Sequence, residues 1–374
     1  MSGAPLRAIP LRSVHLEFGA SFGEFAGFEV PMVYSSTLSE HVAVRSSVGV
    51  FDISHMGRLM VWGEHVGELL ELVYTKRVTR TKVGFMSGPT LALNVHARVK
   101  DDEMWYNVDG ERWFVVPNAA VADHMRDYLR GAAESRGFKV VVEDLRDKYA
   151  MLAIQGPKAV EVMERMGAGW ASSLKPLEFR VGEEVAGRKT FIVSRSGWTG
   201  EDGFEILGEP GALADIFRES VKHGATPAGI AARDTLRIEV GFVLGGHEYG
   251  EDPAKFPCAV SLRYGMGAID WGKRGFIGEE ALRACRREGV RWVRVGLVMR
   301  KESARIIPRQ GYKLYVDDIE VGWVTSGTYS PIIERGIAQA YIDSRYAIIG
   351  ENVNIEVRGV RHEARIQDFP LIKR

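Results

Sequence analysis

Residues 104–116 read MWYNVDGERWFVV. Two runs rich in aromatic and β-branched side chains flank the dipeptide Asp109-Gly110, and Asp-Gly is a favoured turn between paired strands. The pattern predicts a hairpin with strands at Met104–Val108 and Arg112–Val116. Because such a short turn returns the chain beside itself, the stretch favours an antiparallel sheet over a doubly wound parallel sheet.

Around this hairpin the sequence predicts an α+β domain that spans residues 58–149. Apolar residues recur at helical spacing in two segments, and short runs of strand-forming residues lie between them. Antiparallel sheets with flanking helices are typical of the α+β class. The expected helices are residues 64–74 and 118–132, and the further strands are residues 58–62, 90–94 and 139–142.

The C-terminal part of the chain carries no helical pattern after about residue 292. Strand candidates follow one another there, and Asp317-Asp318 and Arg358-Gly359 mark hairpin turns between them. Residues 292–374 are therefore predicted to form a small all-β domain of the barrel or jelly-roll kind. Residues 251–291 are expected to connect it to the rest of the chain.

The overall composition is that of an ordinary globular protein. The 374 residues include 49 Lys and Arg against 49 Asp and Glu, and 45% are hydrophobic. A net charge of zero gives no global attraction to nucleic acid or to anionic lipid, so neither partner is expected. The N-terminal region lacks the apolar run of a secretory signal, and no later run approaches the ~20 apolar residues of a spanning helix. A cytoplasmic protein is expected.

Cys258 and Cys285 are the two cysteines of the chain. They form no CxxC pair, which indicates a reducing compartment without a structural disulfide or zinc site, and both are expected to be buried. The sequence also lacks a Walker A motif, paired histidines at metalloprotease spacing and a nucleophile elbow. It therefore gives no support to ATP-dependent, metal-dependent or serine-nucleophile chemistry, and no metal ligands are expected.

Four dense polar segments remain as candidates for chemistry. Each also fits a structural role, for example Asp101-Asp102 as a solvated turn and residues 232–237 as a helix with charges paired along one face. His55 and Met56 are expected to be turn and core residues. The four segments are FDISHMG at 51–57, DD at 101–102, SGWTGEDGFE at 196–205 and ARDTLR at 232–237.

Together with their neighbours, these segments resemble the aminomethyltransferase of the glycine cleavage system, the T-protein. The segment EHVAVRSSVGVFDISHMG is similar to the family's EHLAVRxxxGxFDVSHMG, and the same order of motifs continues over nearly the whole chain. The resemblance implies three domains around a central folate site, with residues 1–57 and 150–250 forming a discontinuous folate-binding domain. The matching motifs are FAGFEVPMVYSS at 25–36, EHVAVRSSVGVFDISHMG at 40–57, LAIQGPKA at 152–159, SRSGWTGEDGFE at 194–205, PAGIAARDTLRIE at 227–239, GFIGEEAL at 275–282 and VTSGTYSP at 324–331.

The resemblance also implies a reaction and its site. The chain is expected to transfer the methylene of an aminomethyl group on the lipoyl arm of the H-protein to tetrahydrofolate, with release of ammonia. Asp102 is expected to face N5 of the pterin, where a carboxylate can orient the amine and accept its proton. Glu205 suits the 2-amino-4-oxo pterin edge, and Arg233 suits either a glutamyl carboxylate of folate or the support of Glu205. The implied folate contacts are Asn118, Val121, Phe179, Trp198, Glu205, Arg233 and Phe242.

The chain departs from the family pattern near the expected site. The approach to Asp102 is ARVKDD in place of a glycine-rich GGIVDD, so the loop that carries it is expected to lie differently. At three positions where the family has tyrosine, this chain has Pro89, Trp198 and Phe242.

Two alternative functions stay open: a folate-dependent demethylase of a small N-, O- or S-methyl compound, and a non-catalytic folate-binding factor for iron–sulfur assembly or RNA modification. The pterin is either tetrahydrofolate or a modified archaeal-type pterin.

A strongly basic run lies at residues 283–313, with ten Lys and Arg against two Asp and Glu. It is either a solvated face or the docking surface for the H-protein, because exposed charges of one sign speed the encounter with an oppositely charged partner. The arginines expected on such a surface are Arg283, Arg286, Arg287, Arg291 and Arg294.

Overall fold

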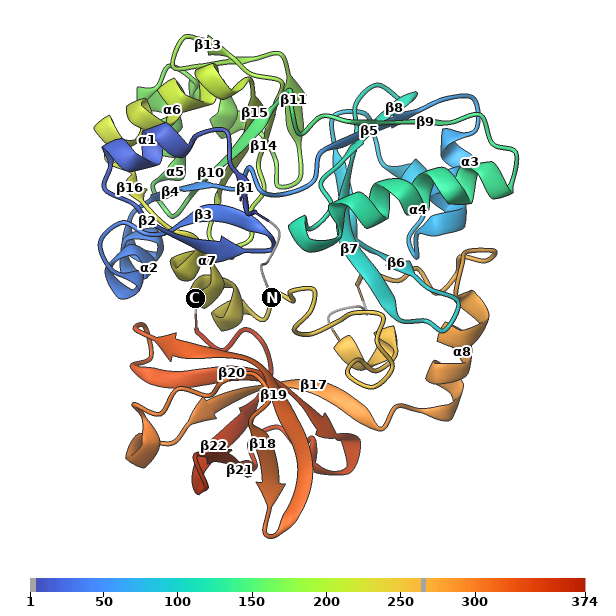
Figure 1. Cartoon of the computed structure of the whole chain (residues 1–374), viewed down its shortest axis with the longest axis vertical. Coiled ribbons are helices and arrows are strands. Elements are labelled where there is room, and N and C mark those ends of the chain that lie inside the picture. The colour runs from blue at the N-terminus through green and yellow to red at the C-terminus, as the bar shows by residue number, and fades with distance from the viewer. Residues whose placement is uncertain (1–4, 264–266, 374) are drawn as a thin grey trace. The chain divides into compact units, whose positions relative to one another are not determined.

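The computed structural model describes residues 5–263 and 267–373 (Figure 1). It confirms the mixed α+β class, with mainly antiparallel sheets, flanking helices and a C-terminal barrel. The finer domain boundaries at residues 57, 149, 250 and 291 stay a prediction. The chain divides into two compact units, the first comprising Met1–Glu71, Arg77–Gly88 and Glu103–Arg233, and the second comprising Leu72–Lys76, Pro89–Asp102 and Asp234–Arg374.

The largest sheet of the first unit has six strands in the order β11-β14-β15-β10-β4-β16. Its neighbouring strands are antiparallel except β4 and β16, which are parallel. Every residue of β10 is buried, as is typical of a central strand that is covered on both faces. The strands are β11 (Phe179–Val181), β14 (Ile192–Ser194), β15 (Gly203–Gly208), β10 (Ala150–Gln155), β4 (Gly49–Asp52) and β16 (Thr226–Pro227).

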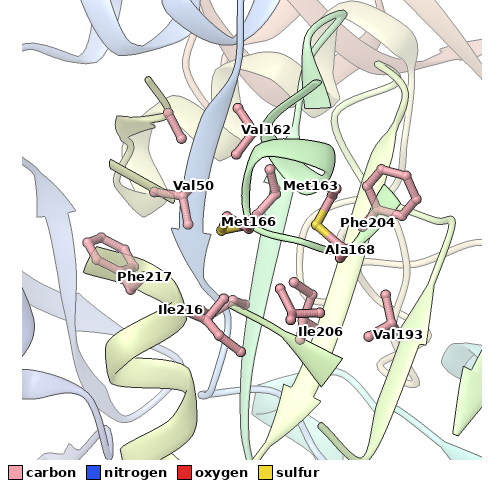
Figure 2. Packing of buried hydrophobic residues seen from close by; sticks show 14 of the residues in the cluster. Val50, Val162, Met163, Met166, Ala168, Val193, Phe204, Ile206, Ile216 and Phe217 are labelled. Carbon is pink, nitrogen blue, oxygen red and sulfur yellow. The ribbon is translucent and has the colours of Figure 1, made fainter. Parts of the chain in front are cut away.

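Helices α5 (Ala159–Arg165) and α6 (Pro210–Lys222) pack their apolar residues onto this sheet. Figure 2 shows Met163 of α5 and Phe217 of α6 in one buried cluster with Ile206 of β15. Burying such side chains contributes roughly 1.5–3 kcal/mol each. The cluster therefore fixes β14 and β15, the two strands that hold the ends of the SGWTGEDGFE segment.

A smaller N-terminal sheet joins β1, β3 and β2 in that order. The buried carboxylate of Glu40, on the following helix α2, accepts hydrogen bonds from the backbone N–H groups of Tyr34, Ser35 and Gly229. Gly229 precedes helix α7, so Glu40 fixes the start of the helix that carries Arg233. The elements are β1 (Arg7–Ala8), α1 (Arg12–Glu17), β2 (Ser21–Phe25), β3 (Phe28–Val33), α2 (Thr37–Ser46) and α7 (Ile230–Val240).

A five-stranded sheet has the order β6-β7-β8-β5-β9. The predicted Asp109-Gly110 hairpin is confirmed, because it joins β7 to β8 and Asn107 pairs with Trp113 across it. Both predicted helices are present, although the second begins with a 3₁₀ turn. The elements are β5 (Leu59–Trp62), α3 (Val66–Val73), β6 (Met86–Leu93), β7 (Val99–Asn107), β8 (Arg112–Val115), η2 (Ala119–Val121), α4 (Ala122–Ser135) and β9 (Val141–Asp144).

Strand β7 begins at Val99 rather than at Met104 as predicted. Asp101 and Asp102 therefore lie within a strand, and the expectations of a loop or a solvated turn at this pair are wrong. Burial alternates along the first half of the strand, with Val99, Asp101 and Glu103 on the buried side. Acidic residues are weak strand formers, and here their buried contacts override that local preference.

The second unit contains a closed barrel of six strands in the order β17-β20-β19-β18-β21-β22. Strand β17 pairs with both β20 and β22, so the barrel has no free edge. The turns predicted at Asp317-Asp318 and Arg358-Gly359 are confirmed. The elements of this part are η4 (Ala259–Leu262), α8 (Glu279–Glu288), β17 (Trp292–Met299), β18 (Lys313–Val316), β19 (Ile319–Ser330), β20 (Arg335–Asp343), β21 (Asn352–Val357) and β22 (Val360–Gln367).

Cys258 and Cys285 are each partly exposed rather than fully buried, and no disulfide joins them. Of the helices in the described part of the chain, none is long and apolar enough to cross a membrane. Over residues 5–263 and 267–373, no group of three or more His, Cys, Asp or Glu side chains is arranged to hold a metal ion.

Candidate functional site

The loop between β14 and β15 is held by the buried side chain of Gln155. Gln155 Nε2 donates to the backbone oxygen of Ser196 at 2.9 Å, and its Oε1 accepts from Thr199 Oγ1 at 3.0 Å. A Cβ at Gly197 would lie 1.7 Å from Gln155 Oε1, so only glycine fits there. Residues 196–199 are therefore fixed between the end of β14 and Glu205 on β15.

Glu205 is half-buried, and its Oε2 accepts a hydrogen bond from Ser196 Oγ at 2.7 Å. Ser196 Oγ also lies 2.8 Å from Ser194 Oγ on the neighbouring strand β14. Within the described residues, Oε1 of Glu205 accepts no hydrogen bond from protein. The network therefore holds one carboxylate oxygen and leaves the other available to a ligand.

Tyr106 of β7 extends this network. Its buried hydroxyl is hydrogen-bonded with Ser194 and Ser196, and burial together with the charge of Glu205 raises the pKa of Tyr106. The ring of Phe179 contacts the Tyr106 ring edge-to-face, with centroids 5.2 Å apart. Sequence reasoning missed Tyr106 and the role of Ser196, although Ser196 lies inside the quoted motif.

Arg233 of α7 is buried, with 7% of its surface exposed. Its guanidinium carbon lies 5.2 Å from the ring centroid of Trp198 and 6.0 Å from that of Phe51. Burial lowers the pKa of Arg233 to about 10, and the charge of Glu205 opposes this shift. Nη1 has no hydrogen-bond partner in the described part of the chain. A buried N–H of this kind is costly unless a ligand accepts its hydrogen.

Asn118 and Val121 flank and end the 3₁₀ turn η2, and both are half-buried. The segment is held against FDISHMG, because Gly57 N donates to the Pro117 oxygen at 2.8 Å. A Cβ at Gly57 would lie 2.9 Å from Ala122 Cβ, so the two segments pack closely. The approach of Asn118 and Val121 to the Glu205 network stays a prediction.

In the second unit, Asp101 and Asp102 both contact the hydroxyl of Tyr249. The hydroxyl oxygen lies 2.5 Å from Asp102 Oδ1 and 3.0 Å from Asp101 Oδ1. Burial, together with these two carboxylates, raises the pKa of Tyr249 well above its usual range, so the phenol keeps its proton. Sequence reasoning missed Tyr249, because no motif links GGHEYGED to the Asp-Asp pair.

Phe242 follows α7 and is half-buried. Its backbone oxygen accepts hydrogen bonds from Arg237 Nη1 at 3.2 Å and from Gln339 Nε2 at 2.8 Å. The structure thus gathers Phe179, Trp198, Glu205 and Arg233 within the first unit. Asp102 and Phe242 belong to the second unit, and their approach to that group stays a prediction.

His55 lies in the turn after β4, and the prediction of a turn and core residue is confirmed. Its ring packs edge-to-face on Phe25, with centroids 5.4 Å apart. Burial, assisted by the charge of Arg233, lowers the pKa of His55 to about 3. The imidazole is therefore neutral in the folded chain at pH 7.

We expect His55 to make stability depend on pH. An unperturbed histidine has a pKa of about 6.5, so the unfolded chain binds a proton between about pH 6.5 and pH 3 that the folded chain does not bind. The free energy of unfolding should therefore decrease as the pH is lowered. Between pH 6.5 and pH 5.5, the wild-type chain should lose about 1 kcal/mol more of it than His55→Phe does. Denaturant unfolding at the two pH values measures this. The control His96→Phe replaces an exposed histidine and should keep the full loss; an equal loss in His55→Phe would contradict the expectation.

The basic run at residues 283–313 is not one continuous exposed surface. Arg294 is 3% exposed and donates to the backbone oxygens of Leu262 and Gly241, because β17 directs it into the structure. Arg283 is partly buried and bonds to Glu279. The expectation that Arg294 contributes to a docking surface is therefore wrong. Of the five arginines expected, the exposed ones are Arg286, Arg287 and Arg291.

Two known domain families match the chain. The GCVT N-terminal domain matches residues 11–263, and the glycine cleavage T-protein C-terminal barrel domain matches residues 293–373. Together the two matches include residues of both compact units, and residues 264–292 lie between them.

Individual relatives are similar over nearly their whole length. A probable aminomethyltransferase from Aeropyrum pernix is 66% identical to the chain over 98% of both sequences. The aminomethyltransferase of Thermus thermophilus is 37% identical, over 98% of this chain and 99% of the relative. The crystal structure of glycine cleavage system aminomethyltransferase T from Bartonella henselae is similar with a TM-score of 0.89 at 28% identity, and 98% of each chain is covered.

Proposed function

Because the chain belongs to the glycine cleavage T-protein family, we propose that it transfers the methylene of an aminomethyl-lipoyl H-protein to tetrahydrofolate and releases ammonia. One observation carries the folate part of the proposal. A carboxylate oxygen of Glu205 and a buried N–H of Arg233 both lack a partner in the described chain, and the Trp198 ring lies beside the guanidinium. A flat ligand with donors and acceptors along its edge suits this group.

In the proposed complex, Glu205 accepts hydrogen bonds from the amino-pyrimidine edge of the pterin. The Ser196 hydrogen bond keeps its other oxygen in place, so the carboxylate is oriented before the ligand arrives. Arg233 donates from Nη1 to an oxygen of the ligand, because that buried N–H has no hydrogen-bond partner in the described residues. Trp198, Phe179, Asn118, Val121 and Phe242 are proposed to line the rest of the folate site.

Asp102 is the proposed catalytic residue. Tetrahydrofolate supplies the nucleophilic N5 that accepts the methylene group. The Asp102 carboxylate orients that amine, takes up the proton that N5 loses on forming the C–N bond, and stabilises positive charge as ammonia leaves. The second bond to the methylene carbon comes from N10 as the lipoyl sulfur leaves with the electrons of its C–S bond. The sulfur takes up the proton that N10 loses, which leaves the carrier in its dihydrolipoyl form.

The decisive experiment follows ammonia release from purified protein and aminomethylated H-protein. Release should require tetrahydrofolate and yield methylenetetrahydrofolate in equal amount. A parallel reaction with a modified archaeal-type pterin tests the choice of acceptor. Folate binding without ammonia release would overturn the transferase proposal; demethylation of a small methyl compound would then support the demethylase, and binding alone the non-catalytic factor.

Docking of an acidic H-protein is proposed on the exposed arginines of the basic run. Arg286 stacks on Trp271 at 4.2 Å and Arg291 on Trp292 at 4.6 Å, so both charges are held in place at the surface. Because exposed charges are screened over about 8 Å at physiological ionic strength, they act mainly on encounter.

We expect the KM for the H-protein to rise with salt, and reversal of Arg286, Arg287 and Arg291 to Glu to raise it about tenfold or more at low salt. Tetrahydrofolate affinity should not change. The matched control R136E/K158E/K189E changes the net charge equally at exposed positions of the first unit and should keep the wild-type KM. A wild-type KM in the first variant would place docking elsewhere.

A further inference from the structure

The hydroxyl of Tyr249 lies within hydrogen-bond distance of two neighbouring carboxylates. It is 2.5 Å from Asp102 Oδ1 and 3.0 Å from Asp101 Oδ1. A phenol carries one hydrogen, so it can donate to only one of these oxygens at a time. The shorter contact is to Asp102, and a charge-assisted O–H···O⁻ bond is the stronger and shorter kind.

Tyr249 is held rigidly where it makes these contacts. Its side chain is 3% exposed and packs in an apolar cluster with Val99, which precedes the Asp-Asp pair on β7. Its backbone oxygen accepts from Gly246 N at 2.8 Å, and a Cβ at Gly245 would lie 3.3 Å from the tyrosine ring. The phenol is therefore placed by packing and backbone bonds, independently of the carboxylates.

We propose that Tyr249 is a positioning residue for Asp102. The Tyr249 hydroxyl donates one hydrogen bond to Asp102 Oδ1 and holds the carboxylate in a single orientation on β7. The inference rests on the proposed catalytic role of Asp102. Asp102 is half-buried on β7, and the terminal torsion of an aspartate has a broad range of accessible angles. A hydrogen bond from a donor fixed in place narrows that range and favours the charged form that must face the reacting amine. Tyr249 itself needs no contact with substrate.

Tyr249→Phe tests the proposal, because it removes the hydroxyl and keeps the packed ring. We expect kcat for ammonia release to fall about tenfold or more, with tetrahydrofolate affinity and KM within about twofold of wild type. The matched control Tyr341→Phe removes another buried hydroxyl of the same unit, which donates to the Glu248 backbone oxygen at 2.7 Å. That control should keep the wild-type kcat.

A double-mutant cycle separates positioning from a general structural effect. If Tyr249 acts through Asp102, then Tyr249→Phe should change kcat by less than about twofold in the Asp102→Asn background. Effects of the two substitutions that simply multiply would overturn the proposal, as would a wild-type kcat in Tyr249→Phe. Wild-type turnover in Asp102→Asn alone would instead remove Asp102 from the proposed function, and this inference with it.

A spectroscopic measurement covers the case in which Tyr249→Phe does not fold. With 3-fluorotyrosine at position 249 of the full chain, the ¹⁹F resonance reports the state of the hydroxyl. Asp102→Asn should shift this resonance, and Asp318→Asn at an exposed Asp-Asp turn should not. An unchanged resonance in Asp102→Asn would overturn the contact.

Discussion

Asp102→Asn should lower kcat about 10²–10⁴-fold and leave tetrahydrofolate affinity within about twofold of wild type. Asparagine keeps the size of the side chain and an oxygen that can still accept from Tyr249, whose hydroxyl lies 2.5 Å from Oδ1. It loses the negative charge and the ability to take up a proton. If the carboxylate acts on N5 only as charge develops, the loss falls on turnover and not on binding.

The measurement pairs ammonia release at saturating H-protein with calorimetry of tetrahydrofolate binding. Asp318→Asn is the matched control, because it changes the second residue of another Asp-Asp pair, in the turn between β18 and β19 where the Asp318 side chain is 97% exposed. It should leave both quantities unchanged. Wild-type turnover in Asp102→Asn would exclude a catalytic role, and a parallel loss of affinity would assign Asp102 to binding instead.

The hairpins show what a sequence can predict about this fold. The turns at Asp109-Gly110, Asp317-Asp318 and Arg358-Gly359 depend on local backbone preferences, and the structure has all three. Three strand pairs of the barrel, β18–β19, β19–β20 and β21–β22, join consecutive strands and need no distant partner. Its closure does not follow from local signals, because β17–β20, β18–β21 and β17–β22 join strands that are separated in the sequence.

The Asp-Asp pair shows where local reasoning fails. Acidic residues favour turns and solvent, yet Asp101 is buried in β7 and bonds to Tyr249, 148 residues away in sequence. Arg294 is a second case, because its burial depends on backbone oxygens at Gly241 and Leu262. Tertiary contacts of this kind leave no periodic pattern, so a charged residue is assigned to the surface by default.

The residues around Glu205 were predicted only through the resemblance of the chain's motifs to those of the T-protein family. Trp198, Glu205 and Arg233 lie in motifs that the resemblance singles out, and the structure gathers them in one unit. The residues that orient them have no such signal. Tyr106 belongs to the hairpin and Gln155 ends a buried strand, and each reaches the site only through the packing of the sheets.

Glu205→Ala should weaken tetrahydrofolate binding by about 1–3 kcal/mol, because the pterin edge loses its acceptor inside the site. Glu205→Gln should weaken it as well, since its amide places a donor where the ligand also donates. Ser196→Ala is the graded control. It removes the 2.7 Å hydrogen bond to Oε2 but keeps the charge, so the expected loss is smaller, about 0.5–1.5 kcal/mol.

Calorimetry of folate binding, together with thermal unfolding of the ligand-free chain, separates two roles of Glu205. Its charge raises the pKa of the buried Arg233, so removing it also leaves that cation less compensated in the free protein. A variant with weaker binding and a nearly unchanged Tm would support direct contact with the ligand. Unchanged affinity with a lowered Tm would instead assign Glu205 to the support of Arg233, and the open N–H of Arg233 would then have to carry recognition of the pterin without it.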